Sequence, residues 1–243
     1  MDRILFDKPI VLGEEILIEG PLMEALRFHR ARRGSILTIT DVKGNDFRGR
    51  VTSIAEEKAS IIIFDRFTSP TESALEIILL QALPKKEKME WIIQKATELG
   101  VSAIIPFKSN KSISIEEREN KQKKAHRWQE IARRATQQCR RSKIPKIGQY
   151  QSFEDILELG DKESLKIILW EKDGIGLKEV LKRGPYKKIY LIVGPEGGFT
   201  EDEVSLAIEK GFIPIKFGQR ILRTETASIV LVGILQYELG DLN

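Results

Sequence analysis

The segment Phe217-Gly-Gln-Arg-Ile-Leu-Arg-Thr-Glu-Thr-Ala227 follows a short apolar run, Phe212 to Phe217, that is typical of a β-strand, and it leads into a helical pattern. A shorter segment, Gly194-Pro-Glu-Gly-Gly-Phe199, lies between a strand pattern at Lys188 to Val193 and another helical pattern. Such loops lie at the carboxyl ends of sheet strands, where open α/β sheets bind ligands. The two loops are therefore predicted to form one site.

The chain from Leu75 onward alternates strand patterns with helical patterns. Strands are expected at Leu75 to Leu83, Val101 to Phe107, Leu165 to Trp170, Ile189 to Val193 and Phe212 to Phe217. Helices are expected at Met89 to Leu99, Ala125 to Cys139, Phe153 to Leu159, from Thr200, whose spacing to Glu203 is a capping-box pattern, and from about Glu225 to Leu239. This alternation predicts a doubly wound, mostly parallel sheet with right-handed crossovers.

Residues 1 to about 67 have the pattern of an all-β domain. Short β-rich runs occur at Ile10 to Ile18, Ser35 to Thr40, Phe47 to Ile54 and Ala59 to Phe67. Their spacing fits a small barrel. The polar, proline-containing segment Thr68 to Ser73 has the composition of a linker. The sequence therefore predicts two domains, residues 1–70 and residues 74–243.

The composition is that of an ordinary globular protein, with 243 residues of which 41% are hydrophobic and 31% charged. No apolar run is long enough to span a bilayer, and the first residues lack the basic-then-apolar order of a signal peptide, so a cytoplasmic protein is expected. Cys139 is the single cysteine, and with only His29 and His126 it provides no ligand set for a structural zinc. No bound metal is expected; a metal site built purely from carboxylates is the alternative, without support in the sequence.

Positive charge is concentrated in two segments, although the net charge is only +4. Ten basic residues and one acid, Glu130, lie between Lys121 and Lys146, and seven basic residues and two acids lie between Arg27 and Arg50. Two such segments favour a long polyanion bound at two places, while a pair of solvated faces is the alternative. In the helix at 125–139, the apolar stripe ends with Cys139, while Arg127, Arg134 and Arg141 are expected to point away from the sheet. Cys139 is accordingly predicted to pack in the core.

The two loops combine glycines with acidic and basic side chains. Gly194, Gly197, Gly198 and Gly218 allow sharp turns and close approach of the backbone to a ligand, but they match neither the dinucleotide fingerprint nor the phosphate loop. Apolar walls for an adenine are expected from Leu169, Val193, Phe217, Ile221 and Leu222. Glu196, Arg223 and Glu225 could remove a proton from a nucleobase and stabilise the anion. The alternative is that these residues only stabilise the start of the following helix. Thr224 would then be its N-cap, and Glu225 a favourable acidic residue in its first turn.

Five segments together resemble one known family. They are Lys88-Met-Glu90, Gln94-Lys-Ala-Thr-Glu-Leu-Gly-Val101, Gln138-Cys-Arg-Arg-Ser-Lys-Ile-Pro145, Gly194-Pro-Glu-Gly-Gly-Phe199 and Gly218-Gln-Arg-Ile-Leu-Arg-Thr-Glu-Thr-Ala227. The set resembles the ribosomal small-subunit RNA methyltransferase E family over nearly the whole chain, most closely over residues 84 to 240. The last two segments, in this order near the C-terminus, are highly specific jointly.

The resemblance implies an S-adenosylmethionine-dependent methyltransferase acting on N3 of a uridine in small-subunit (16S) ribosomal RNA. It also implies an N-terminal PUA-like or OB-like barrel that binds RNA and a C-terminal SPOUT domain, in which the backbone forms a trefoil knot around the cofactor site, an exception to the usual absence of knots. Family members are homodimers with cofactor sites near the subunit interface. The implied partner is ribosomal RNA, within an assembled small subunit.

The resemblance also implies roles for individual residues. The loops Gly194 to Gly198 and Phe217 to Leu222 would hold the cofactor, the second mainly through backbone groups around adenine. Arg223, Thr224 and Glu225 would face the target base or support the loop, and Cys139 would lie near the substrate side. The residues expected to contact RNA are Arg27, Arg32, Arg33, Arg134, Gln138 and Arg141.

Methylation of a pyrimidine carbon generally requires a nucleophile that bonds covalently to the base. Methylation of a ring nitrogen requires only that the nitrogen loses its proton and is aligned with the sulfonium methyl group. A lone cysteine on an apolar stripe fits the second reaction. The hypothesis is that Glu196 or Glu225 removes the N3 proton and Arg223 stabilises the anion, so that Glu225→Gln should reduce methyl transfer strongly and cofactor affinity little. The alternatives are transfer RNA or a ribose hydroxyl as the acceptor, and a non-catalytic RNA-binding protein with steep salt dependence.

Overall fold

The computed structural model describes residues 3–28, 30–43, 45–67, 72–84, 88–112, 123–161 and 163–243. The chain divides into two compact units, Met1–Thr71 and Glu72–Asn243. The predicted linker at 68–73 falls largely on residues 68–71, which lie outside the described residues.

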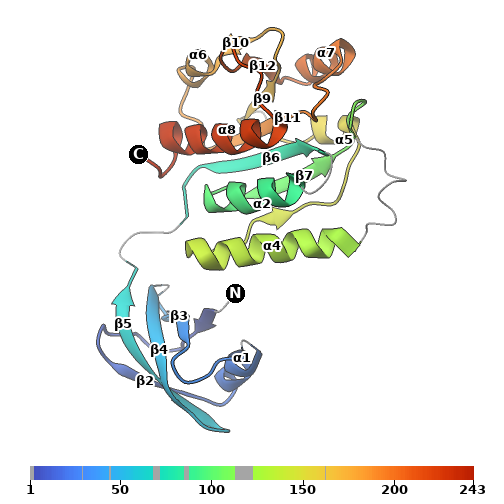
Figure 1. Cartoon of the computed structure of the whole chain (residues 1–243). Helices are drawn as coiled ribbons and strands as arrows, with labels where there is room; N and C mark the ends of the chain where they lie inside the picture. Colours follow the sequence, from blue (N-terminus) through green and yellow to red (C-terminus); the bar gives the residue numbers. More distant parts are fainter. Residues whose placement is uncertain are drawn as a thin grey trace. The chain divides into compact units, whose positions relative to one another are not determined.

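The described residues of the first unit form a mixed five-stranded sheet with one helix (Figure 1). Its elements are β1 (Arg3–Leu5), β2 (Glu15–Glu19), α1 (Leu22–Phe28), β3 (Ile36–Thr40), β4 (Asp46–Ile54) and β5 (Lys58–Arg66). The strand order is β1-β3-β4-β5-β2, in which β1 pairs with β3 in parallel and the other pairs are antiparallel. Alternate side chains of β4 and β5, such as Val51 and Ile61, are buried, as expected for a sheet with one face on a core.

The expectation of an all-β first domain is wrong at two places. The segment Leu22–Phe28 is a helix, whose Met23 and Leu26 are buried one helical turn apart in the core of this unit. Residues before Glu15 do not extend β2 toward Ile10, because Gly13 adopts a left-handed φ of 90° that turns the chain. The three-residue strand β1 pairs with β3, far away in the sequence, and so short a strand could not be predicted from its own residues.

The second unit contains a seven-stranded sheet in which all neighbouring strands are parallel. Its strands are β6 (Glu76–Ala82), β7 (Ala103–Phe107), β8 (Lys146–Ile147), β9 (Leu165–Leu169), β10 (Ile175–Gly176), β11 (Lys188–Val193) and β12 (Ile213–Lys216), in the order β10-β12-β9-β11-β6-β7-β8. The prediction of an α/β fold with a parallel sheet is confirmed. The strands β8 and β10, of two residues each, were too short to predict.

Helices cover both faces of this sheet. Those within the described residues are α2 (Lys88–Glu98), α4 (Lys123–Cys139), α5 (Phe153–Leu157), α6 (Leu177–Leu181), α7 (Glu201–Glu209) and α8 (Thr224–Leu239). Buried side chains of α2, α4, α6 and α8 share one core with Ile77 and Leu79 of β6, and those of α5 and α7 share another with Ile78 and Leu80. Figure 1 shows α8, α2 and α4 on the same side of the sheet. The sheet is therefore buried on both faces, which explains its nearly continuous apolar strands.

The predicted start of α7 is confirmed in detail. Thr200 is the N-cap, its hydroxyl accepts a hydrogen bond from the backbone N–H of Glu203, and the Glu203 carboxylate accepts one from the backbone N–H of Thr200. This reciprocal capping box fixes where the chain leaves the loop 194–199 and begins the helix. The carboxylate of Glu203 also accepts a hydrogen bond from the backbone N–H of Asn110, which ties the loop after β7 to the same point.

Candidate active site

A cavity of about 580 Å³ lies between the two glycine-containing loops at the carboxyl ends of β9, β11 and β12. All nine residues predicted to bind the cofactor line it: Leu169, Val193, Gly194, Gly197, Gly198, Phe217, Gly218, Ile221 and Leu222. Glu196 and Arg223 line it as well, whereas Glu225 does not. The structure thus brings the two predicted loops together around one cavity. It also puts the charged side chains of Glu196 and Arg223 beside the apolar residues of the cavity wall.

Two glycines in this wall have backbone conformations that few other residues adopt. Gly198 has a φ of 65° and Gly218 a φ of 72°, both in the left-handed region. A Cβ at position 198 would come within 2.6 Å of the Glu171 carboxylate, while a Cβ at 218 would meet no atom within 4 Å. The backbone at Gly218 therefore borders open space in the pocket wall.

A buried hydrogen-bond network fixes the first loop against the start of α8. The hydroxyl of Thr224 donates to the carbonyl oxygen of Gly194 at 2.6 Å and accepts from the side-chain amide of Gln81 at 3.1 Å. Gln81 is fully buried in β6, and its amide oxygen accepts from the Ser228 hydroxyl. The interpretation of Thr224 as an N-cap is therefore wrong: the N-cap is Arg223, and the Thr224 hydroxyl is engaged with the loop.

Lys88, the first residue of α2, joins the two acidic residues predicted for catalysis. Its Nζ lies 3.1 Å from Oε1 of Glu196 and 3.1 Å from Oε2 of Glu225. The side chains of Lys88 and Glu196 are 29% and 27% exposed, and that of Glu225 is 14% exposed. Burial by itself lowers the pKa of Lys88, but hydrogen bonds and charge interactions with Glu196 and Glu225 raise it above its usual value. One ammonium group therefore holds two carboxylates from different loops, and the three side chains form the Lys88 cluster.

Sequence reasoning did not identify Lys88 or Gln81 as site residues, although both break a local rule. A lysine at the first position of a helix is unfavourable, because the N-terminal end of the helix dipole is positive. A glutamine in the otherwise apolar strand β6 must have hydrogen-bond partners if it is buried. Such violations of local preference are expected at functional or strained sites, and they could have marked both residues.

The residues predicted to contact RNA lie in both units, and most of them are exposed. In the second unit, Arg134 is 74% exposed on α4 and pairs with Glu130, and Gln138, one turn further on, is exposed too. Hydrogen bonds from Arg133 and Arg134 lower the pKa of Glu130 to about 2. Arg27, Arg32 and Arg33 are exposed in the first unit, on or just after α1. Their contacts with RNA stay a prediction.

The predicted orientation of Arg141 is wrong. Its side chain is only 7% exposed; it pairs with Glu72 at 2.8 Å and donates to the carbonyl oxygens of Thr97 and Val101. Helical spacing does not apply to this residue, because α4 ends at Cys139 and Arg140 adopts a left-handed φ of 65°. Arg141 therefore holds the start of this unit against the end of α2 and does not extend the basic face.

Replacing Arg141 by Met is expected to lower the free energy of unfolding by about 3 kcal/mol, because it leaves the largely buried Glu72 carboxylate without its partner. Urea denaturation measures this change. Arg134→Met is the matched control, since the exposed guanidinium of Arg134 should contribute no more than about 0.5 kcal/mol. Equal stability of the two variants would contradict the structural role of Arg141.

Cys139 lies at the end of α4, half-buried, and its Sγ donates to the carbonyl oxygen of Thr136. Burial raises the pKa of its thiol, so the thiolate is scarce at neutral pH. These surroundings do not favour nucleophilic catalysis, but the prediction that Cys139 packs in the core is wrong: the side chain is only half-buried at the end of α4 and belongs to none of the core clusters of the described residues.

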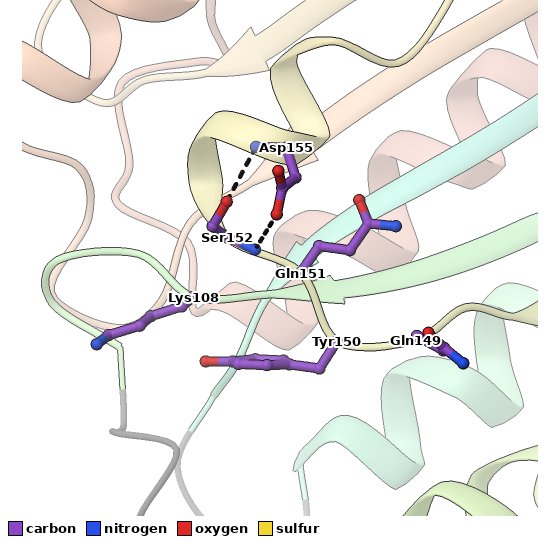
Figure 2. Close-up of a pocket in the computed structure, with 6 residues that line it drawn as sticks. All are labelled: Lys108, Gln149, Tyr150, Gln151, Ser152 and Asp155. Carbon is purple, nitrogen blue, oxygen red and sulfur yellow. Dashed lines mark hydrogen bonds between the residues drawn. The ribbon is translucent and has the colours of Figure 1, made fainter.

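A second hollow lies where β7 ends and α5 begins, and Figure 2 shows the six residues that line it: Lys108, Gln149, Tyr150, Gln151, Ser152 and Asp155. The backbone N–H of Asp155 donates to the Ser152 hydroxyl, and the Asp155 carboxylate accepts from the Ser152 N–H. These contacts form the capping box of α5. None of the predicted site residues lines this hollow.

In the part of the chain that the structure describes, no His, Cys, Asp and Glu side chains gather in a group of three or more suited to hold a metal ion. Within the same residues, no helix has both the length and the apolar character needed to span a bilayer.

Comparison with known proteins gives the class. Residues 71–236 match the model of a family described as the RNA methyltransferase domain, and this range contains both pocket loops and the Lys88 cluster. The predicted enzyme class is therefore confirmed: this is an RNA methyltransferase.

The relatives narrow the class to one family. The chain is 38% identical to ribosomal RNA small subunit methyltransferase E of Buchnera aphidicola, covering 80% of this chain and 76% of that protein, and 30% identical to the protein of the same name in Bacillus subtilis, covering 86% and 84%. It belongs to the ribosomal RNA small subunit methyltransferase E family.

Two solved structures resemble the whole chain. One is ribosomal RNA small subunit methyltransferase E of Neisseria gonorrhoeae bound to S-adenosylmethionine, with a TM-score of 0.76, 31% identity and 99% coverage of both chains. The other is a methyltransferase of Legionella pneumophila with the same bound cofactor, with a TM-score of 0.72, 32% identity and coverage of 99% of this chain and 98% of that one.

Proposed function

We propose that this protein transfers a methyl group from S-adenosylmethionine to N3 of one uridine in small-subunit ribosomal RNA. The observation that carries the proposal is the pocket itself, in which glycine backbone and apolar side chains adjoin Glu196 and Arg223. The names of the relatives and the cofactor bound in two similar structures support the donor and the class of acceptor.

The pocket residues fit S-adenosylmethionine. A cavity of about 580 Å³ is within the range of small-molecule sites. Val193, Phe217 and Leu222 offer an apolar surface for an adenine, and the backbone at Gly218 borders open space that a ligand can approach. When bound, S-adenosylmethionine would supply an electrophilic methyl group attached to a positively charged sulfur, and the rest of the cofactor would leave as a neutral thioether.

The protein's own residues would control the proton and the negative charge. N3 of a uridine carries a proton that must leave before its electron pair can bond to the methyl carbon. Of the two candidate bases, Glu196 lines the pocket and Glu225 does not, so Glu196 is the better placed to accept this proton. Arg223, which also lines the pocket, would stabilise the negative charge on the uracil oxygens.

The exposed basic residues support an RNA partner. A guanidinium that contacts a phosphate releases counterions, so its removal weakens binding to all sequences alike and reduces the salt dependence. Arg134→Met is therefore expected to lower the slope of log affinity against log salt by about 1, as measured by fluorescence anisotropy with a ribosomal RNA fragment. Glu154→Gln, which changes an exposed side chain of α5, is the control. An unchanged slope for Arg134→Met would remove this residue from the interface.

The finer features of the fold are part of the proposal. The first unit would be a PUA-like domain that binds RNA, and the second a SPOUT domain with a trefoil knot around the cofactor. After β12, which lies between β10 and β9, the chain returns as α8 to contacts with α2, β6 and β11, and this return supports a threaded path near the pocket. The protein would act in the cytoplasm, on an assembled small subunit.

The protein would function as a homodimer. Val230 and Tyr237 on α8 are 37% and 59% exposed, and Trp91 of α2, the helix packed against α8, is 60% exposed. An apolar helix that is partly exposed commonly marks an interface. Sedimentation equilibrium of the wild type and of Tyr237→Glu would test this assembly.

The experiment that tests the proposal is nucleoside mass spectrometry of ribosomal RNA from cells with and without the gene. Loss of one 3-methyluridine from small-subunit RNA is expected. Incubation of purified subunits, naked ribosomal RNA and transfer RNA with labelled cofactor distinguishes the acceptors. Loss of a 2′-O-methyl group or labelling of transfer RNA would contradict the proposal, and so would RNA binding without any cofactor binding.

A further inference from the structure

The Lys88 cluster joins three segments that are far apart in the sequence. Lys88 begins α2, Glu196 belongs to the loop after β11, and Glu225 lies in the first turn of α8. Both carboxylates contact the same nitrogen at 3.1 Å, so their oxygens are close neighbours. The three side chains are between 14% and 29% exposed, which limits screening by water.

A lysine at position 88 is electrostatically unfavourable within its own helix. Its ammonium is attached to the positive end of the α2 dipole, where an acidic residue would be more stable. Glu225, in contrast, lies in the first turn of α8, where a carboxylate is favourable. The contacts that explain a lysine at position 88 are therefore those with the two carboxylates, not those within its own helix.

We infer that Lys88 is a positioning residue for methyl transfer, which keeps Glu196 unprotonated and directed toward the acceptor base while Glu225 holds Lys88 in place. This inference rests on the proposed function. Glu196 lines the pocket and would receive the N3 proton, whereas Glu225 is the less exposed partner outside the pocket. After the proton has moved to Glu196, Lys88 is still paired with the Glu225 carboxylate, so the positive charge of Lys88 is still balanced by a negative one.

Other charged groups adjoin this cluster. Arg223 lines the same pocket, the side chain of Lys111 passes beside Gly197, and Glu171 approaches Gly198. Glu90, on the same helix as Lys88, pairs with Arg127 and not with the cluster. Lys88, a cation within the described residues, contacts both Glu196 and Glu225 at 3.1 Å, so its removal should change the protonation of the pair more than removal of Lys111.

The test compares Lys88→Met, Lys88→Gln and Lys88→Arg with Lys95→Met. Lys95 is a matched control, because it lies two turns along the same helix, is 37% exposed and pairs with Glu98 at 2.9 Å. Without an ammonium between them, two neighbouring carboxylates repel, and protonation of one relieves the repulsion. In both neutral variants the acid limb of the pH–rate profile should move up by roughly one pH unit. Separately, kcat at pH 7 should fall at least about tenfold, because Glu196 is no longer held toward the acceptor base.

Lys88→Arg should retain the acid limb of the wild type, and Lys95→Met should match the wild type throughout. The dissociation constant for S-adenosylmethionine, measured by calorimetry, should change less than about threefold in every variant. Carbon-13 NMR of labelled glutamate side chains in the cofactor-free protein provides a readout without catalysis: a carboxylate that titrates at higher pH should appear in Lys88→Met and Lys88→Gln only.

An unmoved acid limb together with an unmoved NMR titration in the neutral variants would overturn the inference, even if kcat fell, because a purely structural role predicts that result. Wild-type protein that methylates no uridine would instead contradict the proposed function. If Lys88→Met does not fold, Lys88→Gln and Lys88→Arg decide the question.

Discussion

Glu196→Gln is expected to lower kcat for methyl transfer by about 10²–10⁴-fold at pH 7, the range that removal of a general base produces. The amide retains the shape of the side chain in the pocket wall but cannot accept the N3 proton. S-adenosylmethionine should bind with nearly unchanged affinity, because the apolar walls and the backbone of the loop 217–222 are untouched. Single-turnover transfer to small subunits, with calorimetry for the cofactor, measures both quantities.

Glu225→Gln, alone and combined with Glu196→Gln, tests whether the second carboxylate acts through Lys88. It too should reduce methyl transfer strongly, by at least about tenfold as in the neutral Lys88 variants, since Lys88 then has one carboxylate partner instead of two. Groups that act as a unit are not additive, so the double variant should be no slower than Glu196→Gln alone. Full activity of Glu196→Gln would exclude it as the base, and additive losses in the double variant would mean that the two residues act independently.

The pocket loops could be predicted from the sequence because the residues that indicate them are neighbours along the chain. Glycines after an apolar strand pattern identify a turn at a sheet edge, and Thr200 with Glu203 identifies the following helix. The Lys88 cluster could not be predicted in this way. Its three members come from distant segments, and only the path of the chain through the sheet brings their charges together.

Arg141 illustrates a different limit of sequence reasoning. Helical periodicity is valid only while the helix continues, and α4 ends at Cys139, two residues earlier. Beyond that point a single left-handed residue, Arg140, turns the guanidinium of Arg141 inward to Glu72. In the first unit, α1 was missed because its seven residues are too few for a helical pattern to stand out among β-rich runs.

Gly218→Ala should weaken binding of S-adenosylmethionine by at least about tenfold, which corresponds to about 1.4 kcal/mol. Gly218 has a φ of 72°, and no atom lies within 4 Å of the position that a Cβ would take. A methyl group there would occupy space that borders the pocket, where the backbone is expected to approach the cofactor. Calorimetric titration of the cofactor into the variant measures the effect.

Gly211→Ala separates this effect from backbone strain. Gly211, just after α7, has a φ of 84° and also has no atom within 4 Å of the position that a Cβ would take, but it does not line the pocket. Both variants should lose stability by about 1–2 kcal/mol, since each puts an L-residue in the left-handed region. Only Gly218→Ala should lose cofactor affinity, because only its methyl group competes with the ligand for the same volume. Equal affinities in the two variants would mean that the loop 217–222 does not approach the cofactor closely, and the assignment of its first half as the adenine-binding wall would then be wrong.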